Sequence, residues 1–253
     1  MHIKTQGLVL RETNYKEADK ILTVLTREGG KRTVKARGCR RKNSPLAASA
    51  QLLVYSEMGL FEYRDYYTLN EADSLELFWG VRSDVEKLAL GSYFAEVAEV
   101  AAPEGVPDRG LLPLVLNALY ALDKLRKPPA LVKAAFELKL LCLAGYEPML
   151  DACAVCGLPE PEGPRLDLSE GVLHCAGCPA GEGISMPLDR LSLEAMRHVA
   201  YGDPKRLFSF PMDPAGMRRM GDACEAFLLT QFERGFRTLD FYKQLTYDGG
   251  ARV

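Results

Sequence analysis

The first part of the chain, to about Asp73, combines short apolar runs with the two-residue alternation of β-strands. Five segments have this character: residues 8–10, 21–26, 31–37, 51–59 and 60–69. Gly29-Gly30 marks a hairpin turn after the second segment, and a further turn is expected at Arg64-Asp65. Five short strands in about 70 residues predict a small closed barrel such as an OB-fold, with an SH3-like barrel as the nearest alternative.

From about Ser74 the apolar residues recur at spacings of three and four, which indicates helices. A first helical region ends at the proline-containing residues 103–107, and four further helices are expected at residues 111–125, 130–144, 188–201 and 215–236. Segment 130–144 is apolar nearly all round, which predicts burial. Gly145 stands where a left-handed helix cap belongs. The pattern predicts an α+β chain with a barrel in residues 1–74 and an α-helical domain in residues 75–253.

The composition is that of a globular protein, with 47% hydrophobic and 26% charged residues in a chain of 253. The first residues lack the apolar stretch of a signal peptide, and no uncharged apolar run is long enough to span a bilayer. The isolated cysteines Cys39, Cys142 and Cys224 fit reduced thiols. We therefore expect a cytoplasmic protein without a membrane segment.

The formal net charge of −2 conceals one strongly basic segment. Eight basic residues between positions 27 and 42 are opposed only by Glu28: Arg27, Lys31, Arg32, Lys35, Arg37, Arg40, Arg41 and Lys42. The rest of the chain is correspondingly acidic. This segregation predicts a polyanion partner for the N-terminal barrel.

Alternation along strand 31–37 places Lys31, Thr33, Lys35 and Arg37 on one face. Together with the basic loop at residues 38–44, this face is expected to line a groove that neutralises phosphates. If about five cations contact a single strand, log K falls against log[salt] with a slope near −3.5. The alternative is a solvated polar face that only keeps the sheet soluble.

Four aromatic residues follow in the next two strands: Phe61, Tyr63, Tyr66 and Tyr67. Single-strand binders use such rings as stacking platforms for bases. Phe61 and Tyr63 share a face, but the same face is equally suited to the barrel interior. Core packing is the interpretation we favour for them.

The motif with the clearest chemistry is a pair of C-x-x-C sequences, Cys153/Cys156 and Cys175/Cys178. The gap of about 18 residues between them is within the range of four-thiolate zinc sites. Each turn directs two sulfurs at one metal, and two turns complete a tetrahedron. The surrounding segment is rich in Gly and Pro, so a metal would supply its missing stability. We expect one structural Zn²⁺ in a zinc-finger module at about residues 148–186.

Other interpretations of the four cysteines are weaker. A redox C-x-x-C is usually single, disulfides need an oxidising compartment, and zinc deaminases need an H-x-E motif that this chain lacks. Four thiolates also close the coordination sphere, whereas catalytic zinc keeps an open position. The motifs of P-loop, zincin, α/β-hydrolase and Rossmann enzymes are absent, and the chain has only three histidines. The sequence gives no positive argument for an enzyme.

Two stretches of the sequence are specific enough to compare with known families. The first is GLVLRETNYKEADKILTVLTREGGK at residues 7–31, continued by VKARGCRR at 34–41. The second is LLCLAGYEPMLDACAVCG at residues 140–157, which runs from the apolar helix into the first cysteine pair. Both resemble the bacterial recombination mediator family RecO. With Cys175 and Cys178 in matching order, the likeness covers most of the chain and thins after about Arg190.

The resemblance implies an N-terminal OB-fold, a helical body, a zinc finger and no catalytic turnover. It also implies binding of single- and double-stranded DNA at the nucleoid, strand annealing, and recognition of the acidic C-terminal tail of single-stranded DNA-binding protein. The partner RecR and, indirectly, RecA recombinase complete the implied set. The predicted DNA-binding residues are Lys31, Arg32, Lys35, Arg37, Arg40, Arg41 and Lys42. The candidates for a basic rim around the tail are Arg126, Lys127, Lys133 and Lys139.

Two other functional classes stay open. One is a zinc-stabilised RNA-binding or translation-associated OB-fold protein, which would prefer structured RNA and would not anneal DNA. The other is a metal-dependent enzyme of unrecognised type, which one zinc held by four thiolates would argue against.

Overall fold

The structure is a computed structural model that describes residues 1–64, 66–107, 110–179, 181 and 183–249. Asp65 of the expected Arg64-Asp65 turn lies outside the described residues. So do Ala180 and Glu182 within the expected zinc module and residues 250–253 of the expected helical domain. The chain divides into two compact units, residues 1–124 with 236–253, and residues 125–235. The expected domain boundary at residue 74 stays a prediction.

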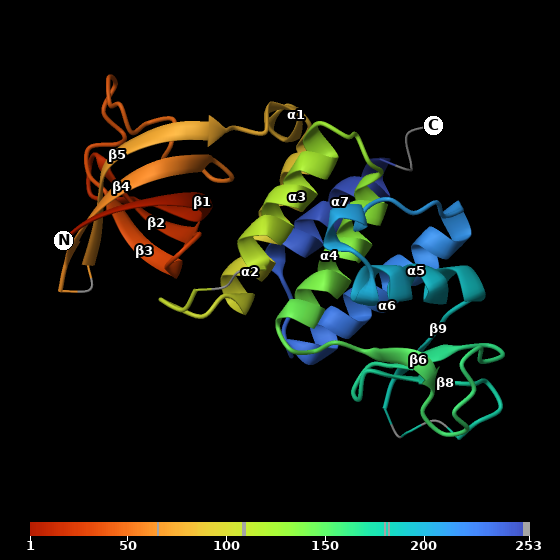
Figure 1. Cartoon of the computed structure of the whole chain (residues 1–253). Helices are drawn as coiled ribbons and strands as arrows, with labels where there is room; N and C mark the ends of the chain where they lie inside the picture. Colours follow the sequence, from red (N-terminus) through yellow and green to blue (C-terminus); the bar gives the residue numbers. More distant parts are fainter. Residues whose placement is uncertain (65, 108–109, 180, 182, 250–253) are drawn as a thin grey trace. The chain divides into compact units, whose positions relative to one another are not determined.

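The N-terminal strands form a closed five-stranded barrel (Figure 1). Its strands are β1 His2–Tyr15, β2 Asp19–Thr26, β3 Gly30–Ala36, β4 Tyr55–Tyr63 and β5 Tyr66–Glu76. Their order around the barrel is β1-β2-β3-β5-β4, with β3 and β5 parallel and the other neighbours antiparallel. This is a Greek-key OB-type barrel followed by helices, so the expected α+β fold class is confirmed.

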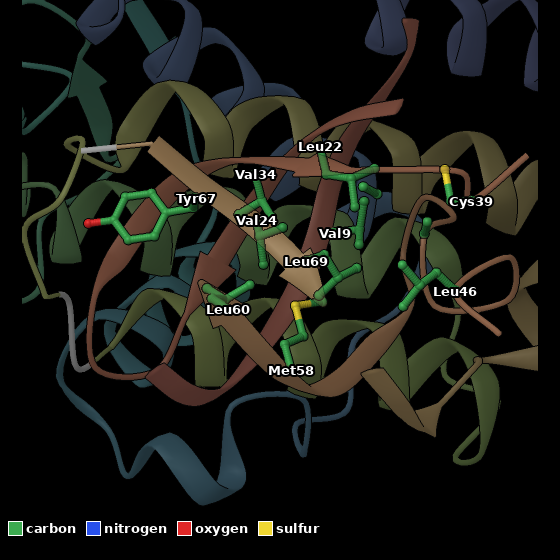
Figure 2. Packing of buried hydrophobic residues seen from close by; sticks show 12 residues of the cluster. Val9, Leu22, Val24, Val34, Cys39, Leu46, Met58, Leu60, Tyr67 and Leu69 are labelled. Atoms are coloured by element: carbon green, nitrogen blue, oxygen red, sulfur yellow. The ribbon is translucent and has the colours of Figure 1, made fainter. Parts of the chain in front are cut away.

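The barrel is filled by apolar side chains from alternate positions of its strands (Figure 2). Inward-facing residues include Val24, Val34, Leu60 and Leu69, each at most 2% exposed. The loop after β3 adds Cys39 and Leu46 to the same cluster. Because the strand period is two, every inward residue leaves its neighbours on the outer face. The outer face is therefore where the chain presents its polar and charged side chains.

The last two barrel strands differ from the expectation of residues 51–59 and 60–69. Residues 51–54 contain turns, β4 begins at Tyr55, and β5 continues to Glu76. Gly59, expected to end a strand, pairs with Lys4 and Glu71 in mid-strand. A Cβ at residue 59 would lie 2.5 Å from Cγ of Glu71, so the glycine makes room for a cross-strand side chain.

The helical region also begins later than the expected Ser74. It opens with the short α1 Trp79–Arg82, followed by α2 Val85–Ala101 and α3 Leu111–Asp123. The side chain of Asp84 caps α2 by accepting from the backbone N–H groups of Glu86 and Lys87. The apolar spacing of this segment alone predicts one continuous helix, but the cap at Asp84 divides it into α1 and α2.

The C-terminal helices were only partly expected. In place of one helix at residues 215–236, the chain forms α6 Pro214–Gln231 and α7 Arg237–Gly249. Glu233 between them has a φ of 50°, in the left-handed region that ends a helix. Helix α7 packs against α2, where Thr238 donates its backbone N–H to Glu96.

The second unit is built around α4 Pro129–Leu143 (Figure 1). This helix is buried on nearly all sides, as its composition predicted. Gly145 has a φ of 92°, and Tyr146 N–H donates to the carbonyl of Leu141, which completes the expected C-cap as a Schellman motif. Helices α5 Arg190–Tyr201 and α6 pack on it, with the 3₁₀ turn η1 Pro204–Arg206 between them in sequence.

The segment between α4 and α5 forms a small four-stranded sheet. Its strands are β6 Met149–Cys153, β7 Arg165–Asp167, β8 Val172–His174 and β9 Ser185–Pro187, in the order β6-β8-β7-β9. Within the described residues, no helix combines the length and apolar character needed to cross a lipid bilayer.

Candidate nucleic-acid groove and metal site

A groove of about 520 Å³ lies on the outer face of the barrel. Its lining residues come from all five strands and from the residue that follows β3: Tyr15, Ile21, Thr33, Lys35, Arg37, Phe61, Tyr63, Tyr66, Tyr67 and Thr68. Strand pairing sets Lys35 between Ile21 of β2 and Thr68 of β5, and Thr68 in turn opposite Phe61. The floor of the groove is thus mixed polar and apolar, with cations and rings in adjoining positions.

The aromatic residues correct the expectation that they pack in the core. Phe61, Tyr63 and Tyr66 are 38%, 59% and 78% exposed, and all three line the groove. Only Tyr67 is buried, at 7% exposed, and it belongs to the core cluster (Figure 2). Alternation placed Phe61 and Tyr63 correctly on one face of β4. Leu60 and Met58 occupy the inner face, so the rings point outward.

Two of the predicted cations, Lys35 and Arg37, line the groove directly. Nζ of Lys35 lies 4.9 Å from the centre of the Tyr15 ring and 3.1 Å from a carboxylate oxygen of Asp19. Arg37 is exposed just beyond the end of β3. Both therefore present positive charge beside an aromatic surface.

Asp19 anchors the basic loop that follows β3. Its carboxylate accepts the backbone N–H of Gly38 at 2.8 Å, and this bond, with Lys35, holds the pKa of the carboxyl below its usual range. Arg40 donates its backbone N–H to the carbonyl of Ala18 and its guanidinium N–H to that of Lys16. These bonds fix residues 38–40 against the β1–β2 turn, while Arg40, Arg41 and Lys42 stay exposed.

The last two predicted cations, Lys31 and Arg32, make other contacts. Nζ of Lys31 donates to the carbonyl of Glu99 at 2.8 Å. The guanidinium of Arg32 lies over the Tyr67 ring and donates to the Tyr67 hydroxyl, and it lines a second cavity of about 160 Å³. All seven residues stay predictions as DNA contacts, and the geometry favours the five from Lys35 to Lys42.

Sequence reasoning missed three residues at the groove's ring surfaces. Nζ of Lys16 lies 5.5 Å from the Tyr15 ring centre, and Cζ of Arg64 lies 5.3 Å from that of Tyr63. The His2 ring meets Phe61 edge-on at 5.2 Å between centres. Lys16 and Arg64 each follow a tyrosine at the end of a strand. This repeated pattern is the feature of the sequence from which their place beside the rings could have been predicted.

The four predicted metal ligands come together at one point. The sulfur atoms of Cys153, Cys156, Cys175 and Cys178 all lie within 4.8 Å of one another, and those of Cys156 and Cys175 are 3.6 Å apart. Zinc–sulfur bonds of about 2.3 Å would place tetrahedral ligands about 3.8 Å apart, so the spacing fits a tetrahedral zinc site and exceeds a disulfide bond.

The small sheet explains this convergence. Strands β6 and β8 are parallel neighbours, and each runs into one C-x-x-C turn at its carboxyl end. The first pair begins at Cys153, the last residue of β6, and the second begins directly after His174, the last residue of β8. An antiparallel β7–β8 hairpin carries the second turn into place.

The thiols themselves favour a bound cation. Backbone N–H groups, with that of Cys156 foremost, lower the pKa of Cys153 to about 6. Burial, followed by the neighbouring sulfurs, raises the pKa of Cys175 to about 12. A second thiolate is costly there until a metal ion compensates its charge. The residues therefore fit a Zn²⁺ held by four thiolates, which would stabilise the sheet and leave no open position for substrate.

The four residues predicted to rim a tail pocket have different environments. Arg126 is exposed, Lys127 is half-buried, and Nζ of Lys139 donates to the carbonyl of Ala200 at 2.9 Å. Lys133 is buried, with Glu137 and Glu225 at 2.8 and 2.7 Å from its ammonium group.

Burial alone would lower the pKa of Lys133, but the two carboxylates outweigh it and raise the pKa. Its pairing gives Lys133 a structural role inside the second unit, since a buried charge needs such partners. The tail pocket stays a prediction, and its best-placed members are Arg126 and Lys127.

Comparisons with known proteins cover both units. Residues 1–78 match the family described as "Recombination protein O N terminal", and residues 82–240 match "Recombination protein O C terminal". The chain is similar to "DNA repair protein RecO" of Acetivibrio thermocellus, 31% identical over 96% of this chain and 97% of the relative. Proteins of the same name are 32% identical in Symbiobacterium thermophilum, over 94% and 96%, and 35% identical in Anaeromyxobacter sp. (strain K), over 89% and 90%.

Proposed function

Because the chain belongs to the RecO family of DNA repair and recombination proteins, we propose that it binds DNA on the barrel groove and anneals complementary strands during recombinational repair. One observation carries this proposal most directly: the cations Lys35 and Arg37 and exposed aromatic rings line the same groove. The groove occupies the β2–β3 face between the β1–β2 and β4–β5 turns, which is the surface on which OB-folds bind oligonucleotides.

The mechanism follows from electrostatics. Two complementary strands repel each other through their phosphates, and a cationic surface that neutralises part of this charge lowers the barrier to pairing. Lys35 and Arg37 in the groove, with Arg40, Arg41 and Lys42 on the adjoining loop, supply that surface on a rigid barrel. Backbone contacts of this kind position a strand without reading its sequence. Annealing is the activity that such sequence-independent binding suits.

The zinc site has a supporting part in this proposal. Four thiolates would hold one Zn²⁺ in a closed coordination sphere and stabilise the module at about residues 148–186. We propose a mediator that changes no covalent bond, with Zn²⁺ as a structural component. Its expected place of action is the nucleoid in the cytoplasm, where its DNA substrate lies.

The proposed partners are proteins that handle the same DNA. They are RecR, the acidic C-terminal tail of single-stranded DNA-binding protein, and, indirectly, RecA recombinase. An acidic tail needs accessible cations beside apolar surface. We propose the exposed Arg126 and the half-buried Lys127 as the first residues to test. Binding to the coating protein would bring the barrel to single strands that are ready for pairing.

Annealing of complementary oligonucleotides, one carrying a fluorophore and the other a quencher, tests the function. We expect faster annealing with the protein than without it, both on bare strands and on strands coated with single-stranded DNA-binding protein. Single-strand affinity should fall with salt at a log–log slope near −3.5, for about five phosphate contacts. No acceleration of annealing, together with tighter binding to structured RNA than to single-stranded DNA, would favour the alternative of an RNA-binding OB-fold protein.

A further inference from the structure

We propose that Tyr15, Tyr63 and Tyr66 make the barrel groove selective for unpaired nucleotides by stacking on their bases. This inference rests on the proposed function and names the form of DNA that the groove itself takes. The three tyrosines are 42%, 59% and 78% exposed, and all three line the groove. Ring surface that is exposed within a groove is available to a ligand.

The rings stand on opposite sides of the groove floor. Tyr15 ends β1 at one edge, and Tyr63 and Tyr66 face each other across the β4–β5 hairpin at the other. Strands β2 and β3 lie between these edges in the barrel order and contribute Ile21, Thr33 and Lys35. A strand that crosses the groove therefore meets a ring, then cations, then two more rings.

Each side of the groove also pairs its rings with cations. Lys35 and Lys16 lie 4.9 and 5.5 Å from the centre of the Tyr15 ring, and Arg64 lies 5.3 Å from that of Tyr63. A nucleotide has the same two parts at short distance, an anionic phosphate and a flat base. The cation neutralises the phosphate while the ring stacks on the base.

Only unpaired strands offer their bases for this contact. In a duplex each base face is already covered by its neighbours, so the rings gain nothing and the phosphates alone remain to be bound. The basic residues should therefore set affinity for both forms of DNA. The tyrosines should set the preference for the single strand.

The test uses fluorescence anisotropy on the full-length protein with three labelled probes of equal length. They are oligo(dT) longer than the ~4–16 nucleotides that an OB-fold covers, a duplex, and a single strand whose sugars carry no bases. The variant is Tyr63→Ala/Tyr66→Ala. The matched control is Tyr120→Ala, which removes a tyrosine of similar exposure (48%) from α3. Circular dichroism and thermal unfolding check that each variant is folded.

We expect the double variant to lose about tenfold or more in affinity for oligo(dT), since each stacked base contributes on that order. Its affinities for the duplex and the base-free strand should change by less than about twofold, because neither probe offers a base to stack. If alanine lowers the thermal stability, Tyr63→Leu/Tyr66→Leu keeps the apolar bulk and removes only the flat ring. The same loss on oligo(dT) is then expected.

Equal losses on all three probes, or no loss on oligo(dT), would overturn the stacking role while leaving DNA binding by the barrel intact. A wild-type protein that binds none of the probes would instead refute the proposed function, and the inference with it. The Tyr120→Ala control is expected to match wild type on every probe.

Discussion

The barrel and the proposed zinc module are both small β structures, but they differ in the residues available to stabilise them. The barrel closes five strands of 7 to 14 residues around an apolar cluster that includes Leu22, Val34 and Leu60. The strands of the zinc module have only 3 to 5 residues, and four sulfurs converge where β6 and β8 end. The barrel has a hydrophobic core, whereas we propose that a metal ion held by the four thiolates stabilises the module. The outer face of the barrel is then free for function.

The two regions also differ in charge. Residues 27–42 hold eight basic residues and one acidic residue, whereas residues 148–186 hold six acidic residues and one basic residue. Phosphates are attracted to the first and repelled by the second. The most conspicuous motif of this sequence, its cysteine quartet, therefore marks the architecture. We propose that DNA binds instead to the basic barrel, a region that has no comparable signature motif.

The largest expected effect is a loss of stability in the zinc module that leaves the barrel unchanged. Cys175→Ser should abolish metal binding and unfold the module around residues 148–186, because structural zinc contributes about 10–16 kcal/mol in zinc-finger peptides. Zinc content and hydrogen exchange of the module measure the loss, while exchange in the barrel should be unchanged. Cys142→Ala, a thiol outside the quartet, is the control and should retain zinc. A zinc-free Cys175→Ser protein with a protected module would contradict the assigned role.

The next largest effect is on DNA affinity, which should depend on the basic charges of the barrel and not on those of the second unit. Arg37→Glu/Arg40→Glu/Arg41→Glu should weaken single-strand binding about a hundredfold near 0.1 M salt, because three phosphate contacts contribute about that factor to the affinity. The control, Lys205→Glu/Arg206→Glu/Arg218→Glu, makes the same change in net charge at exposed residues of the second unit. Titration of a labelled oligonucleotide measures both. An equal loss in the control would mean that net charge, rather than the groove, governs binding.

A smaller effect concerns an acid within the basic surface. Asp19→Asn removes a negative charge, yet we expect it to weaken single-strand binding. The expected loss in affinity is about fivefold, which is what one phosphate contact contributes. The reason is that Asp19 holds Lys35 and Gly38 in place. Asp73→Asn, on an exposed acid of β5, is the control and should not weaken binding. Tighter binding by Asp19→Asn would show that its charge matters more than its position.

The lowered pKa of the Asp19 carboxyl predicts how the stability of the basic loop depends on pH. Because folding lowers its pKa, the contact stabilises the loop fully above the ordinary value of 3.8 and is lost as the pH falls through the lower folded value. Asp19→Asn should remove this acid-side transition.

Much of this architecture could be predicted from local signals. The cysteine spacing, the Gly145 cap and the all-round apolar helix each depend on residues close in sequence, and the structure confirms them. The direction of the aromatic side chains could not be predicted, since alternation shows which residues share a face but not which face is inside. The choice between Phe61 and Leu60 for the core depends on barrel closure, a long-range property.

The missed boundaries have similar causes. β5 extends to Glu76 because its polar residues pair with β4 rather than pack, so they carry no apolar pattern. The cap at Asp84 divides α1 from α2 through a single side chain. The convergence of the two C-x-x-C turns was expected, but the parallel pairing of β6 and β8 that produces it joins residues about 20 apart.

The most direct test of the central claim is the annealing rate of complementary oligonucleotides, measured side by side for the wild type, Arg37→Glu/Arg40→Glu/Arg41→Glu and Cys156→Ser. The expected result is a loss of annealing in the charge variant with an intact fold. The zinc-ligand variant should anneal at the wild-type rate even though its module is destabilised. Two results would contradict the proposal that the barrel binds and anneals DNA. One is annealing at the wild-type rate by the charge variant, and the other is loss of annealing in a zinc-free protein whose barrel is folded.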